Sequence, residues 1–187
     1  MSSLLIIQII SALLGTLALL FVSRNSLLRL EKHGFYRFFV FEFCLLIILL
    51  NIPFWFSNPF YPLQIISWIL LIASLYLVFG SIYYLKKFGG NKERENEASN
   101  FNFENTNYLV KNGIYKYIRH PMYSSLLFLS LGAFLKNVSL FSLFLILAVV
   151  IFLNLTAKTE EKENIKYFGI SYSEYMKETK MFVPFIL

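Results

Sequence analysis

Four long apolar stretches constrain this chain more than any other feature of its sequence. They contain almost no charge, only Glu42 in the second, and they run over Leu4–Val22, Phe38–Phe56, Leu63–Leu85 and Val138–Ala157. About 20 apolar residues in a helix cross the roughly 30 Å of hydrocarbon in a bilayer. A soluble domain with 57% hydrophobic residues and a mean hydropathy of +0.61 could not bury so much apolar surface. The sequence therefore predicts an all-α integral membrane protein.

A fifth apolar segment, Met122–Leu135, would be only about 21 Å long as a helix. We expect it to cross the bilayer with its ends held in protein or at the interface. Numbered along the chain, this segment is span four and Val138–Ala157 is span five. Every basic residue except Lys136 lies between spans one and two, between spans three and four, or after span five. The positive-inside rule then predicts five transmembrane helices, an outside N-terminus and a cytoplasmic C-terminus. The same distribution explains the net charge of +6 without a nucleic-acid partner.

The chain is expected to form one membrane domain over residues 1–187. Three spans occupy residues 1–85, a cytoplasmic connecting loop occupies 86–120, and a helical hairpin with a cytoplasmic amphipathic helix occupies 121–187. The short Pro-rich segment Ser57–Pro62 predicts a tight hairpin between spans two and three. A cleaved signal peptide is the alternative for the first stretch. It is disfavoured because no Lys or Arg precedes Leu4 and no clear small-x-small site follows Val22.

Polar and titratable residues gather at the start of the segment Met122–Leu135. Such residues are costly at a membrane, so they indicate a functional site. Pro121 suits the first turn of a helix, so the span should start there with its positive dipole end at the cytoplasmic face. Free amides at that end favour an anionic group such as a carboxylate, and Arg119 and His120 add to the field. In the alternative interpretation, Arg119 reaches lipid headgroups and His120 only caps the helix.

A second polar cluster, Lys158, Glu160 and Glu161, follows the last span. Carboxylates at a helix C-terminus oppose the helix dipole, so they indicate a compensating ligand. The alternative is a solvated run of charges paired with neighbouring lysines. Glu42, in the second apolar stretch, is a weaker candidate for a functional carboxylate. A metal centre is not expected, because the chain has two His, one Cys and no Asp.

The two clusters match a known family. The first reads Leu109-Val110-x-x-Gly113-x-Tyr115-x-x-x-Arg119-His120-Pro121-x-Tyr123, and the second Glu160-Glu161, Phe168-Gly169-x-x-Tyr172-x-x-Tyr175 and Met181-Phe182-Val183-Pro184. Together they resemble the isoprenylcysteine carboxyl methyltransferases, which are integral membrane enzymes related to phospholipid methyltransferases. The resemblance covers about residues 107–184.

The resemblance implies that S-adenosylmethionine binds at the cytoplasmic face of the membrane. The cofactor contacts it implies are Asn107, Tyr108, Leu109, Val110, Tyr115, His120, Pro121, Met122, Tyr123, Glu160 and Glu161. Family members that methylate prenylcysteine carry an Arg four residues before the first Glu, and this position is Thr156 here. Candidate acceptor-binding residues are therefore Thr156, Lys158 and Arg119. No catalytic base is assigned, because methyl transfer to a carboxylate needs mainly orientation and desolvation.

The sequence thus predicts a multi-pass, S-adenosylmethionine-dependent membrane methyltransferase with its active site on the cytoplasmic face. The leading acceptor is the carboxylate of a prenylcysteine-like or other lipid-linked molecule. The alternatives are N-methylation of a phospholipid, nicotinamide-dependent reduction, and a non-catalytic membrane protein. An amine acceptor would need a base, for which Glu42 or Glu161 is the candidate.

Overall fold

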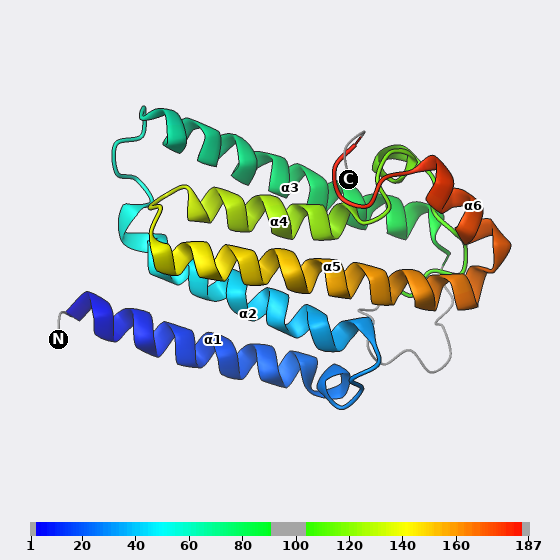
Figure 1. The fold of residues 1–187 in the computed structure, drawn as a ribbon, viewed down its shortest axis with the longest axis horizontal. Helices are drawn as coiled ribbons and strands as arrows, with labels where there is room; N and C mark the ends of the chain where they lie inside the picture. The colour runs from blue at the N-terminus through cyan, green and yellow to red at the C-terminus, as the bar shows by residue number, and fades with distance from the viewer. Residues whose placement is uncertain (1–2, 91–103, 185–187) are drawn as a thin grey trace.

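The structure is a computed structural model that describes residues 3–90 and 104–184 (Figure 1). Six α-helices and two short 3₁₀ helices make up the described chain. They are α1 (Ser3–Leu27), α2 (His33–Asn51), η1 (Ile52–Phe54), α3 (Pro62–Phe88), η2 (Gly113–Lys116), α4 (Pro121–Phe134), α5 (Leu140–Phe168) and α6 (Ile170–Glu178). Proline residues mark where α3 and α4 begin, because Pro62 and Pro121 each occupy the first turn.

Four of the described helices, α1, α2 with η1, α3 and α5, are long and apolar enough to cross a membrane. Helix α4 has 14 residues and does not reach that length. The integral membrane, all-α character of the described chain therefore agrees with the sequence. The fifth span and the sidedness of the bundle stay predictions.

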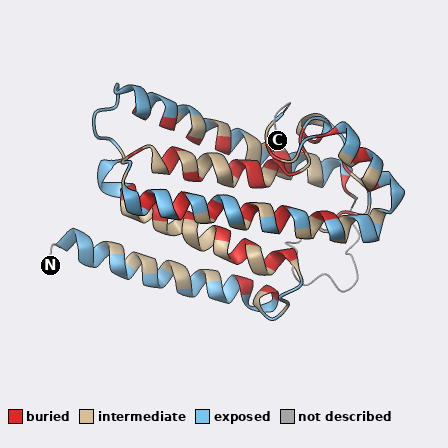
Figure 2. Cartoon of the chain, viewed as in Figure 1, coloured by how far each residue is buried: buried red, intermediate tan, exposed pale blue. Residues whose placement is uncertain are grey.

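Helices α1 to α5 lie side by side as a bundle, with α6 packed across one end (Figure 1). Helix α2 packs along α5, and α4 lies between α3 and the α2–α5 pair. Spans two and three are therefore separated by α4, and the tight hairpin predicted for them was wrong. Helix α1 contacts mainly α2 and is exposed over most of its length, whereas buried residues concentrate on α4 and on the facing sides of α2 and α5 (Figure 2).

Helices α3 and α4 meet through small residues and interhelical hydrogen bonds. Ser67 Oγ donates to the carbonyl of Gly132 at 2.7 Å, and Ser74 Oγ donates to the carbonyl of Ser125 at 2.7 Å. Farther along, Gln64 Nε2 donates to the carbonyl of Lys136 at 2.8 Å. Such contacts hold helices together in lipid, where the hydrophobic effect gives little drive for association. They attach the short helix α4 firmly to a full-length neighbour.

Replacing Gly132 by valine should separate α3 from α4. A Cβ atom on Gly132 would lie 2.9 Å from Leu71 Cγ and 3.1 Å from the carbonyl oxygen of Ser67. Overpacking of this kind costs about 1–3 kcal/mol. We expect a lower melting temperature for purified Gly132→Val in detergent. Leu75→Val, on the exposed side of α3, serves as the control and should melt like the wild type.

Helix α5 corrects two expectations. It continues without a break to Phe168, so Glu160 and Glu161 lie inside the helix and not at its end. The amphipathic segment predicted after Ala157 is therefore divided between the last turns of α5 and the separate helix α6. The fall in hydropathy after Ala157 reflects more polar surroundings and not the end of the helix, because Lys and Glu are good helix formers. The two helices separate at Gly169, whose φ of 64° favours glycine.

The connecting segment 86–120 also differs from a simple loop. Helix α3 extends into it as far as Phe88, and η2 forms within it. Residues 91–103 of this segment lie outside the described chain.

Candidate functional site

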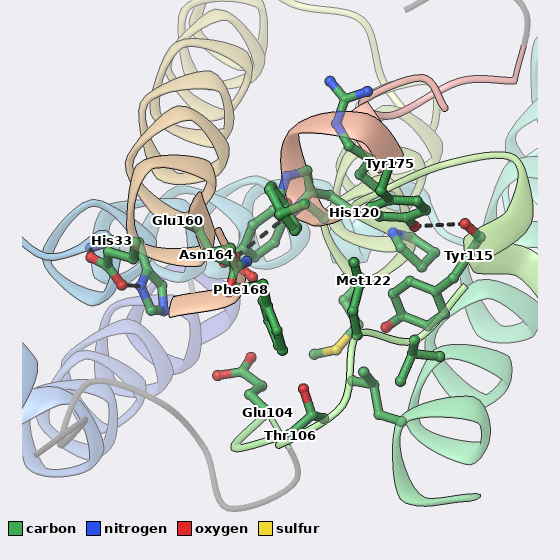
Figure 3. A pocket seen from close by; sticks show the side chains of 18 residues that line it. His33, Glu104, Thr106, Tyr115, His120, Met122, Glu160, Asn164, Phe168 and Tyr175 are labelled. Carbon is green, nitrogen blue, oxygen red and sulfur yellow. Dashed lines mark hydrogen bonds and ion pairs between the residues drawn. The ribbon is translucent and has the colours of Figure 1, made fainter. Parts of the chain in front are cut away.

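A pocket of about 740 Å³, measured out to its open mouth, lies where the start of α2, the end of α3, the start of α4 and the later turns of α5 meet. Helix α6 and residues 104–120 complete its wall. Figure 3 shows Glu160, Asn164 and Phe168 on one side of the pocket and Tyr115 and Met122 on the other, with Glu104 and Thr106 at a further edge. Its lining combines aromatic and aliphatic side chains with a few polar and charged groups, as small-molecule sites commonly do.

Backbone pairing brings the two sequence motifs together. The backbone N–H of Arg119 donates to the carbonyl of Lys180 at 2.8 Å, and the N–H of Lys180 donates to the carbonyl of Tyr117 at 3.0 Å. Ser124 Oγ donates to the carbonyl of Phe182 at 2.6 Å. We call residues 179–182 the C-terminal strap. It holds the segment that leads into α4 against the end of α6 and so brings the two motifs side by side.

The 3₁₀ helix η2 is fixed against α3 by a glycine. Gly113 has φ of 60°, and a Cβ atom there would lie 2.0 Å from the Tyr84 ring. The close approach places Tyr115 in the pocket wall, where its carbonyl accepts a hydrogen bond from Tyr175 Oη at 2.6 Å. Only glycine allows this combination of backbone conformation and contact.

Glu160 is the polar centre of the pocket. Tyr123 donates its hydroxyl hydrogen to Glu160 Oε2, and His120 Nδ1 lies 3.8 Å from the same oxygen. The His120 and Tyr123 rings stack at 5.3 Å between centroids, with 14° between their planes. The start of α4 and the later part of α5 thus share one hydrogen-bonded cluster on the same side of the bundle.

Glu161 points away from the pocket and has a different role. Arg119 Nε donates to Glu161 Oε1 at 2.7 Å, and His120 Nε2 lies 3.3 Å from that oxygen. Arg119 Nη1 also donates to the carbonyl of Met176 at 3.1 Å and to the carbonyl of Thr179. Arg119 borders the pocket, but its guanidinium joins α5, α6 and the C-terminal strap. The Arg119–Glu161 pair thus connects the segment before α4 with α5, α6 and the C-terminal strap.

Replacing Arg119 by lysine should therefore lower stability by about 2–3 kcal/mol, because one ammonium group cannot replace hydrogen bonds from two guanidinium nitrogens. Thermal unfolding in detergent would measure the effect. Arg24→Lys, at an exposed position on α1, is the matched control. An Arg119→Lys protein with wild-type melting but weaker binding of an acceptor would contradict the structural role.

Eight of the eleven cofactor contacts predicted from the sequence line the pocket: Leu109, Val110, Tyr115, His120, Pro121, Met122, Tyr123 and Glu160. The other three, Asn107, Tyr108 and Glu161, do not. Asn107 and Tyr108 are tied to the end of α3, since both of their backbone N–H groups donate to the carbonyl of Gly89. Tyr108 is 68% exposed.

Two of the three acceptor-binding candidates, Thr156 and Lys158, do not line the pocket, whereas Arg119 does. Thr156 is fully buried in the core, where its hydroxyl donates to the carbonyl of Phe152 at 2.7 Å, and Lys158 is exposed outside the lining. Glu42, one of the two candidate bases, accepts a hydrogen bond from Thr16 at 2.7 Å between α1 and α2. It lies outside the pocket lining.

Sequence reasoning missed polar residues that the fold brings to the pocket from other elements. His33, at the start of α2, places Nδ1 2.7 Å from Glu163 Oε2, and its backbone N–H donates to Glu163 Oε1 at 3.0 Å. Arg37 Nη1 donates to Glu104 Oε2 at 2.6 Å, which ties residues after the undescribed segment to α2. Glu163 and Asn164 follow Glu160 at helical spacing, and this periodicity could have identified them.

Three tyrosines of the pocket wall remain neutral hydrogen-bonding groups. Burial raises the pKa of Tyr115 well above its ordinary value, and burial likewise raises the pKa of Tyr172 and of Tyr175. The Tyr175 hydroxyl therefore keeps its proton and continues to donate to Tyr115. The wall offers aromatic faces and neutral hydroxyls beside the carboxylate of Glu160.

Comparison with known proteins identifies the family. Residues 63–171, more than half of the chain, match the model of the phospholipid methyltransferase family. The chain belongs to the phospholipid methyltransferase family. The matched residues include the pocket-lining parts of α3, α4 and α5, whereas His33 of α2 lies outside them. The sequence prediction of a membrane methyltransferase family is confirmed at this level.

A relative supports the narrower resemblance. The protein-S-isoprenylcysteine O-methyltransferase of Saccharomyces cerevisiae is 32% identical to this member of the phospholipid methyltransferase family over 84 residues. The match covers 44% of this chain and 35% of the yeast protein, so the chain spans about a third of that relative's length. The resemblance to isoprenylcysteine carboxyl methyltransferases is thereby confirmed. No solved structure matches the chain.

Proposed function

We propose that this chain binds S-adenosylmethionine in the pocket at the helix ends and transfers its methyl group to an acceptor carried by a lipid. The observation that carries the proposal is the contact between Tyr123 and Glu160 at the centre of one pocket. The two residues come from motifs 37 positions apart in the sequence. Membership of a methyltransferase family supports the same reaction class.

The residues of the pocket fit the chemical groups of this cofactor. Glu160 offers carboxylate oxygens to an ammonium group or to ribose hydroxyls. The first-turn amides of α4, which begins at Pro121, favour a carboxylate. Tyr115 and Tyr172 offer aromatic faces to an adenine ring or a sulfonium.

When bound, S-adenosylmethionine would supply a methyl group on a sulfonium, which an acceptor can take by in-line displacement. The chain's own contribution is orientation and exclusion of water. Tyr115 and Tyr123 are 7% and 4% exposed, so this part of the wall is nearly dry. The C-terminal strap and Arg119 keep the start of α4 aligned with α5.

The leading acceptor is the carboxylate of a prenylcysteine-like or other lipid-linked molecule. Support comes from the two sequence motifs and from the activity named for the yeast relative. A carboxylate is already a nucleophile at neutral pH, so the transfer needs no proton acceptor from the protein.

A phospholipid amine is the second candidate, and two observations favour it. The first is that the family description names phospholipids. The second is that the pocket lining contains the carboxylates of Glu104, Glu160 and Glu163, which suit an amine. The guanidinium of Arg119, which would suit a carboxylate, is hydrogen-bonded to other residues of the protein. The amine would lose a proton as its new N–C bond forms and the S–C bond breaks. The His33–Glu163 pair in the pocket wall is the candidate acceptor for that proton.

Calorimetric titration of the purified full-length protein tests the cofactor assignment. We expect saturable micromolar binding of S-adenosylmethionine and of its demethylated product. The same titration with NADPH should give no heat of binding. Binding of NADPH in place of S-adenosylmethionine would support the reductase alternative, and binding of neither would support a non-catalytic protein.

We also propose that the pocket faces the cytoplasm and that α4 completes a fifth span. The support is the accumulation of basic residues at the pocket end of the bundle. In intact cells, a membrane-impermeant maleimide should label Asn58→Cys, at the opposite end, but not Glu174→Cys on α6. Both variants would carry Cys44→Ser. Labelling of Glu174→Cys alone would reverse the orientation.

A further inference from the structure

A second groove lies between the turn that joins α1 to α2 and the later part of α5. It encloses about 720 Å³ out to its open side. Its lining includes the three lysines Lys32, Lys162 and Lys166 and the hydroxyl groups of Thr159 and Tyr167. Glu163 forms the wall that this groove shares with the pocket described above.

The groove carries an excess of positive charge. Lys162 and Lys166 are one helical turn apart and therefore lie on the same face of α5. None of the three lysines forms a salt bridge with another residue in the described parts of the chain. Of the two acidic residues in the lining, Glu163 is held by His33, which leaves Glu31 as the other carboxylate near three ammonium groups. Ammonium and hydroxyl groups around a hollow suit a phosphate.

Exposed apolar side chains beside the groove indicate that the phosphate belongs to a lipid. Leu28 and Leu30, in the turn that leads to Lys32, are 85% and 62% exposed. Ile170, which begins α6 three residues after Tyr167, is 78% exposed. A soluble phosphate would gain nothing from these neighbours. A phospholipid could place its phosphate among the lysines and its acyl chains against the leucines.

We propose that this groove binds the phosphate of an anionic phospholipid headgroup, separately from the cofactor and the methyl acceptor. The site joins the turn after α1 to α5 at the edge of the bundle, next to the His33–Glu163 wall of the pocket. The inference goes beyond methyl transfer and does not depend on the identity of the cofactor. A bound headgroup would hold the exposed turn 28–32 against α5.

Lipid binding by the full-length protein in nanodiscs tests the proposal. The probe is fluorescent phosphatidylglycerol, presented in a background of phosphatidylcholine, and the quantity measured is its affinity for the protein. The double variant Lys162→Gln with Lys166→Gln should bind the probe about tenfold more weakly than the wild type. The double variant Lys177→Gln with Lys180→Gln removes the same charge from exposed positions elsewhere and should bind like the wild type.

Three outcomes would overturn the proposal. Equal losses in the two double variants would mean that overall charge attracts the lipid, and no loss in either would mean that the groove is not used. Displacement of the probe by inorganic phosphate at micromolar concentration would assign the groove to a free anion. Melting temperatures of both variants should match the wild type, because all four lysines have exposed side chains. Binding of S-adenosylmethionine measured in parallel keeps this test separate from that of the proposed reaction.

Discussion

Glu160→Gln is expected to weaken S-adenosylmethionine binding by about tenfold to a hundredfold. The amide keeps the size of the side chain but removes the negative charge and one of the two acceptor oxygens. Hydrogen bonds to charged groups contribute about 1.5–3 kcal/mol, which corresponds to that loss of affinity. Titration calorimetry on the wild type and the variant would measure it.

Two further variants make this result specific. Glu174→Gln removes a carboxylate from an exposed position on α6 and should leave the affinity unchanged. Tyr123→Phe removes the hydroxyl that donates to Glu160 and should have an intermediate effect. Wild-type affinity in a folded Glu160→Gln protein would contradict the placement of the cofactor at this cluster.

The second large effect is expected at Thr156. Introducing the arginine that the resemblance associates with this position should destabilise the protein by more than about 3 kcal/mol. Thr156 is fully buried, and its neighbours Leu153 and Ala157 are 1% and 0% exposed. A guanidinium there has neither room nor water. We expect Thr156→Arg to fail purification as a monodisperse protein or to melt well below the wild type.

Thr156→Ser provides the control, because serine keeps the hydroxyl that donates to the carbonyl of Phe152. It should fold and bind S-adenosylmethionine as the wild type does. A stable Thr156→Arg protein that methylates a prenylcysteine carboxylate faster than the wild type would reverse our interpretation. It would show that this position faces the acceptor, as the resemblance implies.

The apolar stretches predicted the all-α membrane character of the described chain, and eight of the residues predicted from the two motifs line one pocket. Helices formed where long runs of apolar residues need their backbone bonded internally. Pro121 correctly predicted the start of α4, and residues on both sides of it line the pocket. Glu160 was singled out because carboxylates at a helix C-terminus would oppose the dipole and because the resemblance includes it, but α5 continues past it to Phe168.

Contacts between distant segments could not be predicted in this way. His33 meets Glu163 across 130 positions, and Arg37 meets Glu104 across 67. The local sequence around each of these residues does not indicate which distant residue it will contact. Glu160 and Glu161, which the sequence placed in one cluster, also have different surroundings in the structure. Adjacent residues on a helix point in different directions, so one lines the pocket while the other reaches Arg119.

Transfer of a labelled methyl group tests the central claim most directly. Membranes containing the wild-type chain would be incubated with methyl-labelled S-adenosylmethionine, a farnesylcysteine analogue and phosphatidylethanolamine, and the extracted lipids would be separated. We expect label in the lipid fraction with the wild type and a strong reduction with Glu160→Gln. Label on farnesylcysteine would identify O-methylation, and label on phosphatidylethanolamine would identify N-methylation. Binding of S-adenosylmethionine without label in any lipid, across a full range of membrane lipids and prenylated acceptors, would contradict this claim.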